Sequence, residues 1–412
     1  MTSSRLPLAG VRVVEFGQYI AAPGAAMLLA DLGAEVIKVE GLSGDSARNP
    51  DAAGHAPMFV AYNRHKRSVA LDLRSTAGAE AARRLALSAD VVLHNTRVGV
   101  MERVQLDAPS LRARKPGLIH ASITGFGRSG PSRSRPGLDI AAQAESGMMS
   151  ITGEREGGPL KAGFTVVDVA TASATANAIL AALFRRAMQG EGDTIEVSLL
   201  AVAVQVQAQL WAEYQCSGQL PQRVGNCQPK VAPAADVVAV ADGHLVISAT
   251  TDAHWLRLCT AIGQPQLADD PRFACNASRV ANRPALLAAL GAALGPLRAE
   301  DAREQLERHN VVVGVVRNYQ QVLDSPDVQA SGIFAPVDVG ERTIRVPDLP
   351  FAMDSITQSR LPHKTPGRIP QLGEHTTAVL AELGYAAADI AQMHQDGAIG
   401  IHPSPLRTEA LA

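Results

Sequence analysis

Residues 11–40 read VRVVEFGQYIAAPGAAMLLADLGAEVIKVE, and this stretch decides the expected fold. The apolar run Val11–Glu15 predicts a short strand, and a helix is expected to open at Ala21–Pro23, where proline is favoured in a first turn. Gly33 is placed to end that helix, and Glu35–Val39 predicts a second strand. Strand, helix and strand in this order indicate a parallel pair with the helix packed on one face.

The same alternation continues along the chain. A helix is expected over residues 77–88, strands over 91–93 and 118–123, a long helix over Asp168–Gln189 and a strand over 194–199. These elements predict an α/β fold with a large, doubly wound, mostly parallel sheet. The pattern loosens at 215–235, which predicts a linker to a smaller α+β domain at 236–336, and it loosens again at 337–370.

Composition excludes several classes of function. The 412 residues carry 38 Lys and Arg against 40 Asp and Glu, so the net charge of −2 offers no basic surface for nucleic acid or anionic membranes. The charge-free apolar runs at 169–184 and 197–212 are shorter than the roughly 20 residues of a bilayer span. The N-terminus lacks a signal-peptide core, and the four cysteines form no Cys-x-x-Cys pair, so a cytoplasmic location is expected.

Familiar cofactor motifs are missing from the sequence. The first expected strand is followed by residues 16–22, FGQYIAA, in place of the glycine-rich dinucleotide fingerprint. The sequence also holds no P-loop, no zincin motif and no G-x-S-x-G elbow. We therefore expect neither a metal site nor a tightly bound cofactor.

Several stretches together resemble the class III CoA-transferases, the family of formyl-CoA and carnitine CoA-transferases and of α-methylacyl-CoA racemase. They occur in family order along nearly the whole chain: VVEF (13–16), DLGAEVIKVE (31–40), NRHKRS (63–68), LDL (71–73), SITGFG (122–127), GLDI (137–140), DDPRF (269–273) and LGEHT (372–376). The resemblance implies a Rossmann-like large domain in which residues 371–412 complete residues 1–214. It also implies an interlocked homodimer with coenzyme A and acyl-CoA as substrates.

The resemblance makes Asp168 the catalytic residue, at the head of the long central helix. It implies that Asp168 attacks an acyl-CoA thioester and that CoA then passes, through aspartyl anhydride and aspartyl-CoA intermediates, to a small carboxylic acid. From the residues alone, a helix N-cap is the favoured explanation of Asp168, and only the resemblance reverses this preference. At such a position the helix dipole would keep the carboxylate ionised, with free N–H groups beside it for an oxyanion. Asp139 is a candidate supporting carboxylate near it.

Two alternative functions stay open on the sequence. A racemase needs a proton-carrying residue at position 138, where this chain has Leu138. A non-catalytic CoA-binding protein would use Asp168 only as a cap. Succinyl-CoA as donor and a dicarboxylate as acceptor follow from the family's range of substrates.

The resemblance also implies which residues contact CoA, whose phosphates favour Arg and Lys. The candidates lie on the first loop and after later strands: Gln18, Tyr19, Ile20, Leu71, Arg74, Asn95, Thr96 and Arg103. Some family members place a phosphate-binding arginine where this chain has Gly41. His65, His254 and Arg272 are weaker candidates for contact with a substrate carboxylate, and residues 248–254 lack the glycine run of the oxalate-using branch.

Overall fold

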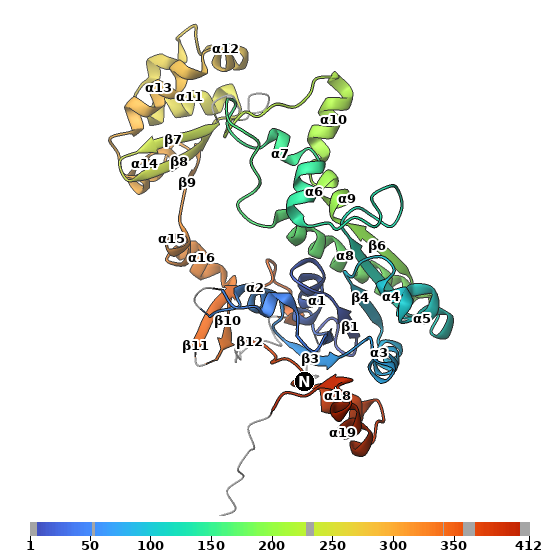
Figure 1. Ribbon diagram of the computed structural model, residues 1–412. Helices are drawn as coiled ribbons and strands as arrows, with labels where there is room; N and C mark the ends of the chain where they lie inside the picture. Colours follow the sequence, from blue (N-terminus) through green and yellow to red (C-terminus); the bar gives the residue numbers. More distant parts are fainter. Residues whose placement is uncertain (1–5, 52–53, 228–234, 341, 357–366, 404–412) are drawn as a thin grey trace, which may run out of the picture. The chain divides into compact units, whose positions relative to one another are not determined.

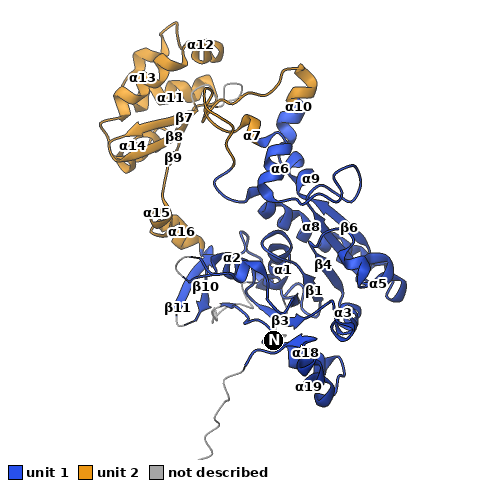
Figure 2. Ribbon diagram, viewed as in Figure 1, with its two compact units in different colours: residues 1–148, 162–212, 332–412 blue, residues 149–161, 213–331 orange. Residues whose placement is uncertain are grey.

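The structure is a computed structural model that describes residues 6–51, 54–227, 235–340, 342–356 and 367–403 (Figure 1). The chain forms two compact units, one of residues 1–148, 162–212 and 332–412 and one of residues 149–161 and 213–331 (Figure 2). Residues 149–161, which the sequence places in the large domain, group with the second unit instead. Hydrogen bonds explain this, because Gly225 donates to the Gly153 carbonyl over 3.0 Å and Arg223 donates to the Ser150 carbonyl over 3.3 Å.

A seven-stranded sheet organises the first unit in the order β13-β3-β2-β1-β4-β5-β6. The first six strands in sequence run parallel, whereas β13 runs antiparallel to β3 at the edge. Their bounds are β1 Arg12–Phe16, β2 Glu35–Glu40, β3 Lys66–Leu71, β4 Val91–His94, β5 Ile119–Thr124, β6 Thr194–Ser198 and β13 Ile399–Gly400. The chain builds outward from β1 in one direction and from β4 in the other, so a topological switch point lies between these two strands.

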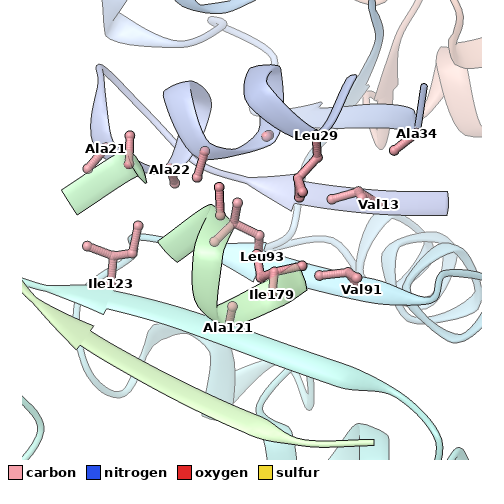
Figure 3. Packing of buried hydrophobic residues seen from close by; sticks show 14 of the residues in the cluster. Val13, Ala21, Ala22, Leu29, Ala34, Val91, Leu93, Ala121, Ile123 and Ile179 are labelled. Atoms are coloured by element: carbon pink, nitrogen blue, oxygen red, sulfur yellow. The ribbon is translucent and has the colours of Figure 1, made fainter. Parts of the chain in front are cut away.

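Helices cover both faces of this sheet, which confirms the predicted α/β architecture. Alternate strand residues face opposite sides, so Val13 of β1 joins one apolar cluster and Val14 joins the other. Figure 3 shows Leu29 and Ile179 packed toward Val13 and Leu93 in the first cluster. That face is covered by α1 Ala21–Asp31 and α8 Val166–Gln189, and the other by α3 Thr76–Ser88, α5 Ala108–Arg114, α18 Thr376–Glu382 and α19 Ala387–Gln395. The remaining helices of the first unit are α2 Pro57–Tyr62, α4 Val100–Arg103, α6 Asp139–Glu145 and α9 Leu199–Gln205. Helices α7 Met148–Ile151 and α10 Ala208–Ser217 lie where the chain passes from one unit to the other.

A second, three-stranded sheet occupies part of the expected return linker. Its order is β11-β10-β12, formed by β10 Phe334–Val339, β11 Arg342–Pro347 and β12 Gly367–Arg368. Buried Val337 and Val346 pack with Val60 of α2. Buried and more exposed residues alternate around these two valines, as is typical of strands. The prediction of a linker throughout 337–370 is therefore wrong at these strands, and residues 357–366 lie outside the described residues.

The second unit is an α+β structure with its own core. Trp255 and Phe273 meet edge to face at 5.8 Å within that core. Its antiparallel sheet has the order β7-β8-β9, formed by β7 Asp236–Val240, β8 Gly243–Ser248 and β9 Val312–Val315. Its helices are α11 Asp252–Ala261, α12 Asn276–Ala281, α13 Arg283–Leu294, α14 Ala299–Glu307, α15 Tyr319–Leu323 and α16 Pro326–Ser331. Of the linker expected at 215–235, residues 228–234 lie outside the described part of the chain.

Helix α8 is long and apolar enough to cross a bilayer by length and composition, the one such helix among the described residues. Its small residues nevertheless pack closely on α1, because a Cβ at Gly24 would lie 3.0 Å from the Ala172 Cβ. Ala176 and Ile179 continue this contact into the core. These contacts are those of a central core helix.

Candidate active site

The amino-terminal end of α8 holds Asp168, but the helix begins two residues earlier than the sequence suggested. Thr165 precedes the helix, and its side chain makes no capping hydrogen bond. Asp168 is the third helical residue, in the first turn, so the expectation that Asp168 itself caps α8 is wrong. The start was mispredicted because Val166 and Val167 are apolar residues that give no helix-start signal.

Asp139 caps the helix from elsewhere in the chain. Its Oδ2 accepts the backbone N–H groups of Val167 at 2.8 Å and Asp168 at 3.0 Å. Its other oxygen accepts the side-chain amide of Gln143, one turn further along α6. The Gln143 side-chain oxygen Oε1 in turn accepts the Ala162 N–H at 2.9 Å, so the segment leading into α8 joins the same network. Asp139 and Gln143 are 6% and 0% exposed, and such a buried, fully bonded network is rigid.

Like charge and burial set the electrostatics of Asp168. Burial, with the neighbouring Asp139 charge second, raises the pKa of Asp168 to about 6. The helix dipole therefore does not determine its ionisation, in contrast to the expectation from sequence. The Val167 and Asp168 N–H groups are also occupied by Asp139, so they are not the free oxyanion donors expected there. At pH 7 about nine-tenths of the carboxyl is still ionised.

Tyr62 is a neighbour of Asp168 that the sequence did not identify. It ends α2, and burial, together with the Asp168 charge, raises the pKa of the Tyr62 phenol. A Cβ at Gly24 would lie 3.5 Å from the Tyr62 ring and 3.0 Å from Ala172, one turn beyond Asp168. Helices α1, α2 and α8 thus meet at Gly24, and the phenol remains a protonated hydrogen-bond donor at neutral pH.

The loops after β1 and β4 meet at the switch point of the sheet. The Gln18 N–H donates to the Asn95 side chain at 2.9 Å, and the Asn95 amide donates back to the Gln18 carbonyl at 2.8 Å. Tyr19 adopts a left-handed backbone with φ 64° and is 45% exposed, whereas Ile20 is buried. Thr96 pairs through its hydroxyl with His94 Nδ1 at 3.0 Å. Four of the eight predicted CoA contacts therefore gather here: Gln18, Tyr19, Asn95 and Thr96.

The other predicted CoA contacts are less favourably placed. Leu71 is 1% exposed within the core, so its side chain is not available to a ligand there. Arg74 follows β3, two strands away from the switch point, and pairs with Asp72 at the surface. Arg103 ends α4 and donates to the Gly99 carbonyl at 3.0 Å.

The candidates for a substrate carboxylate all have partners within the chain. His254 pairs with the Thr250 hydroxyl at 3.0 Å, and Arg272 pairs with Asp270 at 2.7 Å. His65 lies 4.0 Å from Asp31. No group of three or more His, Cys, Asp or Glu side chains that could hold a metal ion occurs among the described residues.

Position 41 lacks the arginine that some class III CoA-transferases place after the second strand. The nearby Arg48 makes two 2.7 Å contacts to Glu40 and stacks 3.7 Å from the Phe59 ring. Its guanidinium is therefore engaged within the chain and is 18% exposed.

An α/β sheet with a carboxylate at a helix end and converging loops at its switch point defines an enzyme-like site. Residues 8–376 match CoA-transferase family III, and the chain belongs to this family. It is 36% identical to the succinate–glutarate CoA-transferase of Agrobacterium fabrum, covering 93% of this chain and 97% of that protein. It is also 36% identical to the succinyl-CoA:mesaconate CoA-transferase of Haloarcula marismortui, over 91% and 96% of the two chains. The protein is thus a class III CoA-transferase.

A solved structure agrees with this assignment. The crystal structure of a CAIB/BAIF family protein from Brucella suis superposes with a TM-score of 0.81 at 35% identity. It covers 92% of this chain and 100% of that one. The resemblance found in the sequence motifs is confirmed at the level of the family and the fold.

Proposed function

We propose that this enzyme moves CoA from succinyl-CoA to a short dicarboxylic acid with Asp168 as nucleophile. One observation carries the assignment of Asp168: Asp139 already caps α8, so Asp168 is not needed as a cap. Among the described residues, no hydrogen bond or ion pair engages the Asp168 carboxylate, and burial, with the Asp139 charge second, raises its pKa to about 6. A half-buried carboxylate without a structural partner is the arrangement expected of a reactive group.

The proposed reaction exchanges acyl groups without net proton transfer. The Asp168 carboxylate attacks the thioester carbonyl, the C–S bond breaks, and a mixed anhydride and CoA thiolate form. The thiolate attacks the aspartyl carbonyl, which releases succinate and leaves an aspartyl-CoA thioester. The acceptor carboxylate attacks the aspartyl carbonyl of this thioester, the C–S bond breaks, and a second anhydride and CoA thiolate form. The thiolate then attacks the acceptor carbonyl of the anhydride, which gives the acceptor-CoA thioester and frees the Asp168 carboxylate.

The substrates are proposed from the relatives and from the site. The named relatives use succinate with glutarate, or succinyl-CoA with mesaconate. A short dicarboxylate acceptor is therefore the first class to test. Leu138, beside Asp139, cannot carry a proton, so the racemase alternative has no support from a second base at that position.

We also propose a homodimer, with the interlocked form that the family resemblance implies. Phe184 and Met188 lie four residues apart on α8, and each is 70% exposed. Large exposed apolar side chains on one helix face support a protein partner. Light scattering should give twice the monomer mass, and replacing both residues by Glu should lower it, whereas a monomeric wild type would contradict the proposal.

Trapping tests the covalent mechanism directly. The protein is incubated with succinyl-CoA, quenched with hydroxylamine and mapped by mass spectrometry. Hydroxylamine should convert the activated Asp168 carbonyl to a hydroxamate, and the Asp168→Asn variant should show none. A hydroxamate on another residue, or none while CoA still binds, would refute Asp168 as the nucleophile.

A further inference from the structure

Four buried charges form a connected group on and beside strands β1, β2 and β3. The group consists of Glu15 of β1, Lys38 of β2, Lys66 of β3 and Asp45, which follows β2. All four side chains are 0% exposed. Two carboxylates face two ammonium groups, so the group, which we call the buried quartet, is neutral overall. Burying four charges is expensive and must be compensated by complete hydrogen bonding.

Lys66 joins β1, the first turn of α1 and the end of α2, and the two helices contact the Asp168 end of α8. Its ammonium donates to Glu15 at 2.7 Å, to the Pro23 carbonyl at 2.8 Å and to the Asn63 side chain at 2.9 Å. All three of its donors are thus satisfied. Pro23 precedes Gly24, which packs against Ala172 of α8, and Asn63 follows Tyr62.

Lys38 and Asp45 hold the neighbouring loop. The Lys38 ammonium donates to Glu15 at 3.0 Å and to the Gly17 carbonyl at 2.8 Å, and it lies 2.9 Å from Asp45. Asp45 accepts the Tyr19 N–H at 3.2 Å. The left-handed backbone of Tyr19 is a conformation that a non-glycine residue adopts at a cost, so these contacts stabilise it.

We propose that Lys66 is a positioning residue for acyl transfer, which fixes the first turn of α1 and the end of α2 against the Asp168 end of α8. The inference rests on the proposed function, because it assumes acyl transfer at Asp168. A group of this kind acts by holding reacting atoms in the right geometry, and a displacement of about 1 Å reduces a rate about 100-fold. Lys66 does not touch the substrate in this scheme.

A matched control lies two residues earlier. Arg64 is as deeply buried, at 2% exposure, and its guanidinium pairs with Asp31 at the opposite end of α1. Lys66→Met takes one of two cations from buried Glu15, and Arg64→Met takes the guanidinium from buried Asp31, so both should lower the melting temperature. We expect only Lys66→Met to reduce the single-turnover rate with succinyl-CoA, about 100-fold, with CoA binding changed less than about 3-fold. Arg64→Met should keep its rate within about 3-fold of the wild type.

A pH profile adds a measurement that loss of stability alone would not change. Burial lowers the pKa of Lys66 to about 8, with Glu15, Lys38 and Asp45 as the charged groups facing it. The wild-type rate should therefore fall above about pH 8 as the ammonium loses its proton, and Lys66→Met should lack this alkaline limb. If Lys66→Met does not fold, Asn63→Leu removes one of the three contacts and should lower the rate without altering the limb.

The outcomes separate this inference from the function on which it rests. Equal rates in folded Lys66→Met and Arg64→Met, or an unchanged alkaline limb in Lys66→Met, would overturn the role of Lys66 while trapping at Asp168 still succeeded. Failure of trapping in the wild type would instead refute the proposed function, and this inference with it.

Discussion

The buried quartet and the Asp168 end of α8 surround their carboxylates with opposite kinds of charge. Glu15 receives an ammonium group on each oxygen, at 3.0 and 2.7 Å, and its charge is fully balanced. Asp168 has the negative Asp139 beside it, and burial and that charge raise its pKa. Complementary charge fixes a carboxylate as a structural element, whereas burial beside a like charge makes the ionised form of a carboxylate costly.

The largest expected effect is on turnover. Asp168→Asn keeps the size and polarity of the side chain but removes the nucleophile, so kcat should fall by about 1,000-fold or more. Steady-state transfer from succinyl-CoA to glutarate measures this. Asp139→Asn is the control, because it changes a carboxylate in the same network without removing the proposed nucleophile, and a similar loss in both variants would contradict the distinction between them.

Removing a charge from the buried quartet should lower the stability of the fold. Glu15→Gln leaves Lys38 and Lys66 facing each other without their shared anion, so it should lower the free energy of unfolding by about 3–5 kcal/mol. Urea unfolding at pH 7 measures the change. A loss below about 1 kcal/mol would show that the quartet is not the structural element inferred from its contacts.

Asp168→Asn should increase stability while it removes activity. The pKa of Asp168 is raised in the folded state to about 6, above its value of about 3.9 in an unfolded chain, so folding loses stability as the pH rises through 4 to 6. The uncharged variant avoids this loss. It should be more stable by about 1–3 kcal/mol at pH 8 and equal to the wild type near pH 3.5, and unfolding curves at both pH values would decide it.

The smallest expected effect concerns the acidic limb of the pH profile, the fall of the transfer rate at low pH as Asp168 gains a proton. Asp139→Asn removes the neighbouring negative charge, so the pKa of Asp168 should fall below about 6 and the acidic limb should move to lower pH. An asparagine oxygen can still accept the two backbone N–H groups, so α8 should lose about 1 kcal/mol of stability at most. An acidic limb that stays in place would assign the raised pKa to burial alone.

Much of the site could be named from the sequence, but not its connections. Asp168, Asp139, Gln18 and Asn95 were singled out through the family resemblance. All four, with Gln143, take part in hydrogen bonds that span from 4 to 77 positions. Gln143 had a usable signal, because it stands four residues after Asp139 on one helix face. Tyr62 had no such signal, and Lys66 stood only within the NRHKRS stretch with no role assigned to it. The packing of α1, α2 and α8 is what gives both residues their contacts.

The cap of α8 could not be predicted from the residues next to it in the sequence. An aspartate before an apolar helix is read as a cap, because the sequence shows only neighbours along the chain. The structure supplies Asp139 from 29 positions away as the cap. The β10–β11 pair was missed for a related reason, since prolines and charges obscured the alternation that buries Val337 and Val346.

The sequence by itself determined the alternation of strands and helices, and hence the parallel sheet, because periodic burial of apolar side chains is a local property. It also determined the family, through motifs spread along the chain. Only the tertiary structure decided which carboxylate caps α8 and which is left unpaired, and that Lys66 joins β1, α1 and α2. Charge balance and burial depend on groups far apart in sequence, and these become neighbours only when the sheet order is set.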